Sequence, residues 1–163
     1  MDFHHIQSSI AAQKIGLFEI CAEDMLFARK AWRYIYPYSE TALSDFYEND
    51  FVKKLTGQLP NYSKLILVGK QINYWNNIFS HGFDETYIND AIRIINVHQK
   101  LGISLSDYIT SYAIMLQEFE DVLRNERAND LCLAENLSGL RKVFFVDISI
   151  VCSLYTDVKP RPL

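Results

Sequence analysis

The chain has 163 residues, of which 49% are hydrophobic, so it can bury the core of one globular domain. Its 20 acidic residues outnumber 16 basic ones and give a net charge of −4, which argues against nucleic acid as a partner. Six glycines and four prolines are few for this length, and this scarcity argues against a barrel or sandwich of many strands joined by turns.

The cysteine pattern and the chain's apolar runs predict a cytoplasmic protein. The three cysteines, Cys21, Cys132 and Cys152, are odd in number and form no C-x-x-C pair, so neither a disulfide framework nor a thiolate metal site is expected. The N-terminal MDFHHIQSS lacks the basic and apolar regions of a signal peptide. The longest apolar run, residues 143–154, is interrupted by Asp147 and is shorter than the ~20 residues that span a membrane.

Apolar residues recur at helical spacing from residue 23 onward. The first predicted helix covers residues 23–36 and ends before Pro37, which interrupts helical hydrogen bonding. A second predicted segment covers residues 40–51, and Pro60 marks the boundary that follows it. The third predicted helix carries an apolar face composed of Leu65, Val68, Ile72, Trp75 and Phe79.

The second half of the chain predicts three more helices. Asp84 can cap the start of one helix, which ends at Leu101 and Gly102, where glycine suits a C-terminal cap. Ser104 and Asp107 resemble a capping box that opens a long amphipathic helix reaching residue 123. A polar loop over 124–130 then leads to a last helix ending near residue 155. No segment indicates a strand, so the predicted fold class is all-α.

His98 is the most informative single position. It lies on the apolar face of its helix with Ile88, Ala91 and Ile95, one turn before a glycine. The residues alone leave two interpretations open. One is a core histidine whose nitrogens bond to a nearby carbonyl or hydroxyl; the other is a neutral imidazole that ligates a haem iron in a dry pocket.

Several segments, in order, resemble the globin-coupled sensor family. Residues 96–103, NVHQKLGI, are similar to its V-H-x-x-[IL]-G-[IL] motif, and 107–112, DYITSY, to its W-Y-I-x-x-Y stretch. Residues 83–88, FDETYI, match F-D-x-x-Y-[IV], Phe46-Tyr47 resembles its F-Y pair, and residues 141–155 are similar to its final helix. The resemblance implies a globin-like helical sandwich over 21–158, with an extra N-terminal helical segment over 1–20 and a C-terminal tail over 159–163.

The resemblance also implies a site. His98 corresponds to the proximal ligand of haem b (iron protoporphyrin IX), and Tyr47 to a phenol that donates a hydrogen bond to bound O2. Aligning Trp75 with the family's aromatic places Val68 opposite the iron, or Leu67 or Gly69 if the register shifts. Gln71, one turn on, is either a second donor or a polar residue facing solvent, and the second is expected. Other expected haem-pocket residues are Leu65, Ile72, Ile95, Ile103 and Tyr108.

The function implied by the resemblance is that of a haem-based O2 sensor domain. Such a domain binds O2, CO or NO at the iron, forms a homodimer through its last two long helices, and signals to an output module such as a diguanylate cyclase or a chemotaxis region. Because the chain stops just after the globin, we expect an excised domain or a stand-alone member. No catalytic residues are expected, since phosphate-loop, dinucleotide, nucleophile-elbow and zinc-protease motifs are missing from the sequence.

Two other functions stay open at this point. One is a stand-alone globin with NO or O2 redox chemistry, which would need a reductase as an electron donor. The other is a cofactor-free helical interaction module, in which His98 is only a core residue. Haem uptake separates the second alternative from a sensor, and turnover with an electron donor separates the first.

Overall fold

A computed structural model describes residues 12–57 and 63–157 of the chain. The expected tail over 159–163 and the first eleven residues of the expected N-terminal segment lie outside the described residues; residues 12–17 form a short helix. All regular structure in the described ranges is helical, which confirms the all-α prediction.

The first half of the fold consists of α2 (Ala22–Ile35), η1 (Tyr36–Tyr38), α3 (Ser39–Glu48), α4 (Asp50–Thr56) and α5 (Lys64–His81). Pro37 lies within the single 3₁₀ turn η1, where α2 gives way to α3. The predicted single helix over 40–51 is wrong in one respect, because Asn49 leaves the helical conformation. Its side chain accepts a hydrogen bond from the backbone N–H of Phe51 at 3.0 Å and so caps a new helix.

The second half consists of α6 (Glu85–Lys100), α7 (Leu105–Glu126) and α8 (Leu133–Asp157). Asp84 caps α6 by accepting the N–H of Tyr87 at 2.9 Å, and Ser104 caps α7 by accepting the N–H of Asp107 at 3.0 Å. Gly102 has a φ of +70°, a value that glycine adopts without the strain other residues meet. This turn brings α7 back directly after α6.

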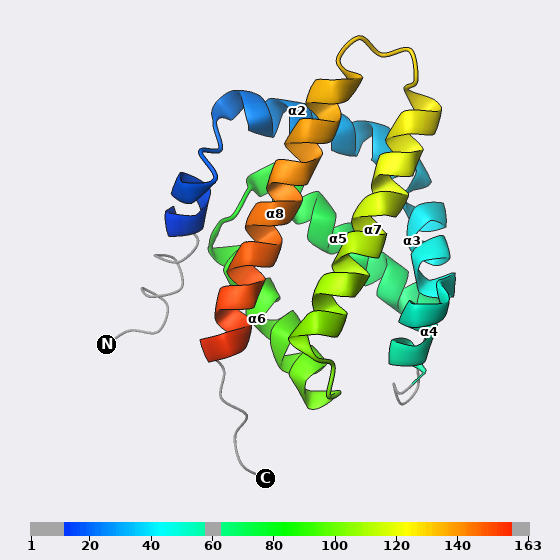
Figure 1. Cartoon of the computed structure of the whole chain (residues 1–163), viewed down its shortest axis with the longest axis vertical. Coiled ribbons are helices and arrows are strands. Elements are labelled where there is room, and N and C mark those ends of the chain that lie inside the picture. The colour runs from blue at the N-terminus through cyan, green and yellow to red at the C-terminus, as the bar shows by residue number, and fades with distance from the viewer. Residues whose placement is uncertain (1–11, 58–62, 158–163) are drawn as a thin grey trace.

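The helices form a two-layered sandwich. In Figure 1 the antiparallel pair α7 and α8 lies in front, and α2 and α5 cross behind it. α2 packs on α5, α7 and α8, and α3 packs on α5 and α7, so the layers share one core. Aromatic rings fill it: Trp75 stacks on Phe144 with ring centroids 4.1 Å apart, and Trp32 stacks on Phe79 at 5.1 Å.

Two helix crossings are specified by small residues or buried polar groups. Gly139 of α8 lies against the backbone of α2, where a Cβ would come within 2.8 Å of the Asp24 carbonyl. Asp147, also on α8, is fully buried and bonds to tyrosines of α5, α6 and α7. These contacts fix α8 against the elements that surround the site described next.

Candidate functional site

A cavity of about 460 Å³ lies between α3, α4, α5, α6 and α7. This volume is within the range of small-molecule and cofactor sites. Its walls are mostly apolar and aromatic, with polar side chains at one border. The cavity therefore has the lining that favours a large, flat, mainly apolar ligand with a polar edge.

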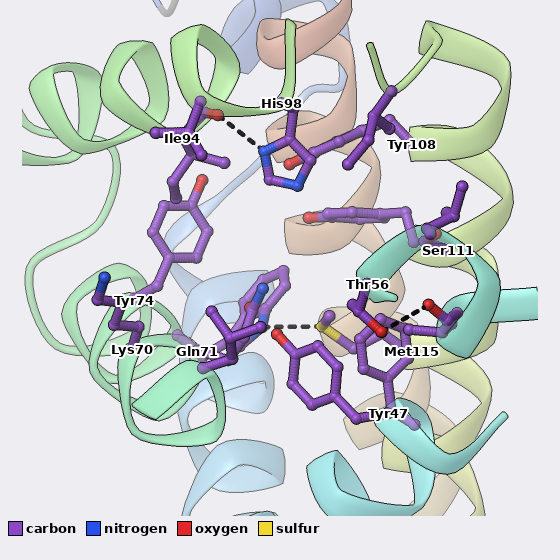
Figure 2. Close-up of a pocket in the computed structure, with 18 of the residues that line it drawn as sticks. Tyr47, Thr56, Lys70, Gln71, Tyr74, Ile94, His98, Tyr108, Ser111 and Met115 are labelled. Carbon is purple, nitrogen blue, oxygen red and sulfur yellow. Dashed lines mark hydrogen bonds between the residues drawn. The ribbon is translucent and has the colours of Figure 1, made fainter. Parts of the chain in front are cut away.

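His98 enters this cavity from the last turn of α6. Its Nδ1–H donates a hydrogen bond to the backbone carbonyl of Ile94 at 2.7 Å, and its ring meets Tyr108 edge-on, with centroids 5.1 Å apart. Because a carbonyl oxygen only accepts, Nδ1 must carry the proton, and the neutral ring keeps its lone pair on Nε2. Burial lowers the pKa of His98, which favours this neutral form. Figure 2 shows the ring facing the cavity.

Tyr47 lies on the other side of the cavity from His98 (Figure 2). It belongs to α3, its side chain is 6% exposed, and the ring of Phe46 packs against it edge-on at 4.8 Å. The neighbouring hydroxyls of Thr56 and Ser111 donate to carbonyls of their own helices, at 3.0 and 2.9 Å. Tyr47 thus places a phenol in this wall of the cavity.

The α5 wall of the cavity differs from the expected register. The structure places Leu67, Gln71 and Tyr74 in the lining, and these residues share one helix face at steps of four and three. Val68 is buried in the core rather than in the lining. Leu65, 72% exposed, lies in solvent at the start of α5.

Val68 and Leu67 face different sides of α5, because each residue turns a helix by about 100°. Val68 and Ile72, which were expected to line the pocket, instead lie in or against the core outside the cavity lining. Gln71, expected to face solvent, lines the cavity instead.

The remaining expected pocket residues divide in the same manner. Ile103 and Tyr108 line the cavity, whereas Ile95 is fully buried in the core and its neighbour Ile94 lines the cavity instead. Sequence reasoning missed Ser111, Met115 and Thr56, among others. Ser111 and Met115 could have been found from the helical repeat. Ser111 lies three residues after Tyr108, and Met115 lies four residues after Ser111, so the three side chains share one helix face.

A polar border closes the cavity between α5 and α6. Lys70, Asn73 and Asn77 come from α5, and Asp90 and Arg93 come from α6. Arg93 pairs with Asp90 at 3.1 Å, and its side chain is 75% exposed, so the guanidinium stays in contact with water. Two cations thus stand at the wet edge of an otherwise apolar cavity.

The family of the chain follows from a comparison with known protein families. The model of the Protoglobin family matches residues 8–161 and so spans nearly the whole sequence. The chain belongs to the Protoglobin family. Among curated proteins, none matches the chain. Membership agrees with the resemblance to globin sensor domains, and it makes this protoglobin a globin-type haem domain that binds gaseous ligands.

The residues of this protoglobin fit a haem. The half-buried imidazole of His98 directs its Nε2 lone pair toward the cavity, and such a nitrogen is the donor that a haem iron requires. The apolar walls suit the porphyrin faces, and Lys70 and Arg93 suit the two propionate groups. Within residues 12–57 and 63–157, no three His, Cys, Asp or Glu side chains gather as a metal site.

The structure also bears on membrane insertion. No helix in the described part of the chain is long and apolar enough to cross a bilayer.

Proposed function

We propose that this protoglobin is a haem b-based O2 sensor domain with His98 as the proximal iron ligand. The observation that carries the proposal is the His98 ring, whose Nδ1–H is fixed by the Ile94 carbonyl at 2.7 Å while Nε2 points into the cavity. Such a hydrogen bond sets the tautomer and the orientation of a ligating histidine. When bound, the haem supplies an iron at which O2, CO and NO coordinate.

The side opposite His98 favours a polar diatomic ligand. Tyr47 is fixed in a nearly dry wall, where a hydroxyl stabilises developing negative charge more strongly than it would in water. Bound O2 carries more negative charge than bound CO, so a phenol donor favours O2. Gln71 lies on the same side of the cavity as Tyr47 (Figure 2), and its side-chain amide offers a second hydrogen-bond donor. The assignment of Leu67 in place of Val68 to this wall is part of the proposal.

Signalling forms the second part of the proposal. A change of ligand at the iron would move His98 and the ring of Tyr108, which lies in the first turn of α7. A homodimer formed through α7 and α8 would pass this change to a C-terminal output module. Differential contacts in the two ligand states are what such a population shift requires. The proposal includes a cytoplasmic location. The sequence favours this location because its cysteines are three in number and form no C-x-x-C pair.

The test is reconstitution of the full chain with haem b, followed by visible spectra of the ferrous protein under argon, O2, CO and NO. We expect an intense Soret band and a distinct, reversible spectrum for O2 and CO. Rapid NO turnover with an electron donor would favour the redox globin instead. Failure of the folded protein to take up haem would leave the cofactor-free interaction module.

A further inference from the structure

A buried carboxylate joins three tyrosines beside the cavity. Oδ1 of Asp147 accepts hydrogen bonds from the hydroxyls of Tyr74 and Tyr87, both at 2.6 Å, and Oδ2 accepts one from Tyr112. Asp147 is fully buried, and the tyrosines come from α5, α6 and α7. A carboxylate removed from water in this way is costly, so its three phenol donors compensate for lost hydration.

The same arrangement prepares a proton transfer. Burial raises the pKa of the Asp147 carboxyl, which makes its carboxylate a stronger base than that of an exposed aspartate. Burial and the nearby Asp147 charge also raise the pKa of Tyr112 well above its usual value, so this phenol keeps its proton. The proton of Tyr112 can therefore leave along an existing hydrogen bond when the ring loses an electron.

Tyr112 differs from the other two tyrosines in its neighbours. It lines the cavity and alone occupies Oδ2, whereas Tyr74 and Tyr87 share Oδ1. Its ring stacks near that of Tyr108 with centroids 6.0 Å apart, and Tyr108 meets His98 at 5.1 Å. A continuous series of rings thus connects the expected iron ligand with the phenol that is bonded to a base.

We infer that Tyr112 is a redox-active tyrosine that gives an electron to the haem pocket and its proton to Asp147 when hydrogen peroxide is the oxidant. The inference rests on the proposed haem binding, since haem supplies the centre at which peroxide is reduced. It adds a peroxide-dependent one-electron oxidation to the gas binding proposed above. Dissolved phenols of the guaiacol kind are the expected reductants.

The reaction balances with two phenols for each peroxide. Hydrogen peroxide takes up two electrons and two protons, its O–O bond breaks, and two waters leave. Tyr112 loses one electron, and its O–H bond breaks as the proton passes to Oδ2 of Asp147. One guaiacol supplies the second electron and releases the second proton to solvent. A second guaiacol then gives one electron to the Tyr112 phenoxyl and releases its own proton to solvent, and the proton held by Asp147 returns to Tyr112 along the same hydrogen bond.

The structure offers matched controls for this inference. Tyr87 bonds to the same carboxylate but does not line the cavity, and Tyr108 lines the cavity but is not one of the three Asp147 donors. Tyr74 combines both features and tests the choice of Tyr112 directly. Each is compared as a tyrosine-to-phenylalanine variant, which removes only the hydroxyl.

The experiment mixes the ferric, haem-reconstituted full chain with hydrogen peroxide and records freeze-quenched electron paramagnetic resonance spectra. In wild-type protein containing ring-deuterated tyrosine, we expect a narrowed tyrosyl signal. In D2O this signal should show coupling to one exchangeable deuteron, the one now held by Asp147. Tyr112→Phe should lose most of the signal, whereas Tyr87→Phe and Tyr108→Phe should keep it.

Several outcomes would overturn the inference. These are a wild-type radical without the deuteron coupling, an undiminished signal in folded, haem-loaded Tyr112→Phe, or a signal lost in Tyr74→Phe but kept in Tyr112→Phe. The wild-type coupling decides the matter even if Tyr112→Phe does not fold. A wild-type protein that binds haem but forms no tyrosyl radical removes this inference alone, whereas failure to bind haem removes the proposed function and this inference with it.

Discussion

At the residue scale, the position of His98 in the cavity lining supports the proposal that this cavity holds a haem. In a histidine with a purely structural role, we would expect both ring nitrogens to be hydrogen-bonded within the packed core. Here Nδ1 is committed to the Ile94 carbonyl, and the ring edge that carries Nε2 faces the cavity (Figure 2). The sequence alone left these two interpretations open. The Nδ1 hydrogen bond fits both of them, and the cavity beside the Nε2 edge is what supports the proposed ligand.

Tyr47 gives the first prediction at this scale. Tyr47→Phe removes a hydroxyl that we expect to donate to bound O2, a bond of about 1 kcal/mol. O2 dissociation should therefore become roughly fivefold faster. CO dissociation should change little, because bound CO is less polar. Stopped-flow measurements with both gases check this result. Equal acceleration of the two gases would show that the phenol acts by steric contact and not as a donor.

Single residues also show where sequence reasoning reaches its limit. The helix end after His98 could be predicted, because Leu101 and Gly102 form the expected C-terminal turn, in which Gly102 has a positive φ. The α5 wall could not be placed, because Leu67 and Val68 are both apolar and helical periodicity cannot say which apolar face meets a cavity. Tertiary contacts decide this: Val68 packs into the core and Leu67 lines the cavity.

At the scale of elements, helix boundaries followed from local chemistry. The caps Asp84 and Ser104 lie where the sequence predicted them, since side-chain oxygens there bond to free backbone amides. The break at Asn49 was missed because apolar periodicity continues across it to Phe51. The Asp147 contacts were also missed, since they join residues 35 to 73 positions apart along the chain.

The crossing of α2 and α8 gives a prediction for one element pair. Gly139→Ala would place a Cβ 2.7 Å from the backbone nitrogen of Ala28, so the two helices must separate. We expect this to lower the free energy of unfolding by about 1–3 kcal/mol. Urea unfolding followed by circular dichroism measures the change.

Gly69 provides the matched control, because nothing lies within 4 Å of a Cβ built on that helical glycine. Gly69→Ala should leave the free energy of unfolding unchanged or raise it by about 0.5–1 kcal/mol. Equal effects of the two substitutions would refute the close crossing as the reason for glycine at position 139.

At the scale of the whole molecule, the cavity lies between helices of both layers, and the α7–α8 pair forms an outer layer of the sandwich (Figure 1). Apolar side chains remain exposed on both of these helices, among them Ile109 at 44% and Phe145 at 53%. Ile109 lies on α7, the helix that also carries Tyr108 and Tyr112 in the cavity lining. This arrangement supports the proposed route from ligand to dimer.

Sedimentation tests that interface. We expect the wild-type chain to sediment as a dimer at micromolar concentration, and Phe145→Glu to shift it toward the monomer by placing charge in an apolar contact. Leu26→Glu, at an equally exposed position on α2, should leave the dimer intact. A monomeric wild type, or dimers that survive Phe145→Glu, would count against a dimer formed through this face of α8.

The central claim is that His98 holds a haem iron in this cavity. The most direct measurement is the visible spectrum of the ferrous and CO-bound protein for wild type and His98→Gly, with and without added imidazole. We expect a strong Soret band in wild type, loss of the histidine-ligated spectrum in His98→Gly, and its return when imidazole fills the space left by the side chain. A His98→Gly spectrum identical to that of wild type without imidazole would contradict the account.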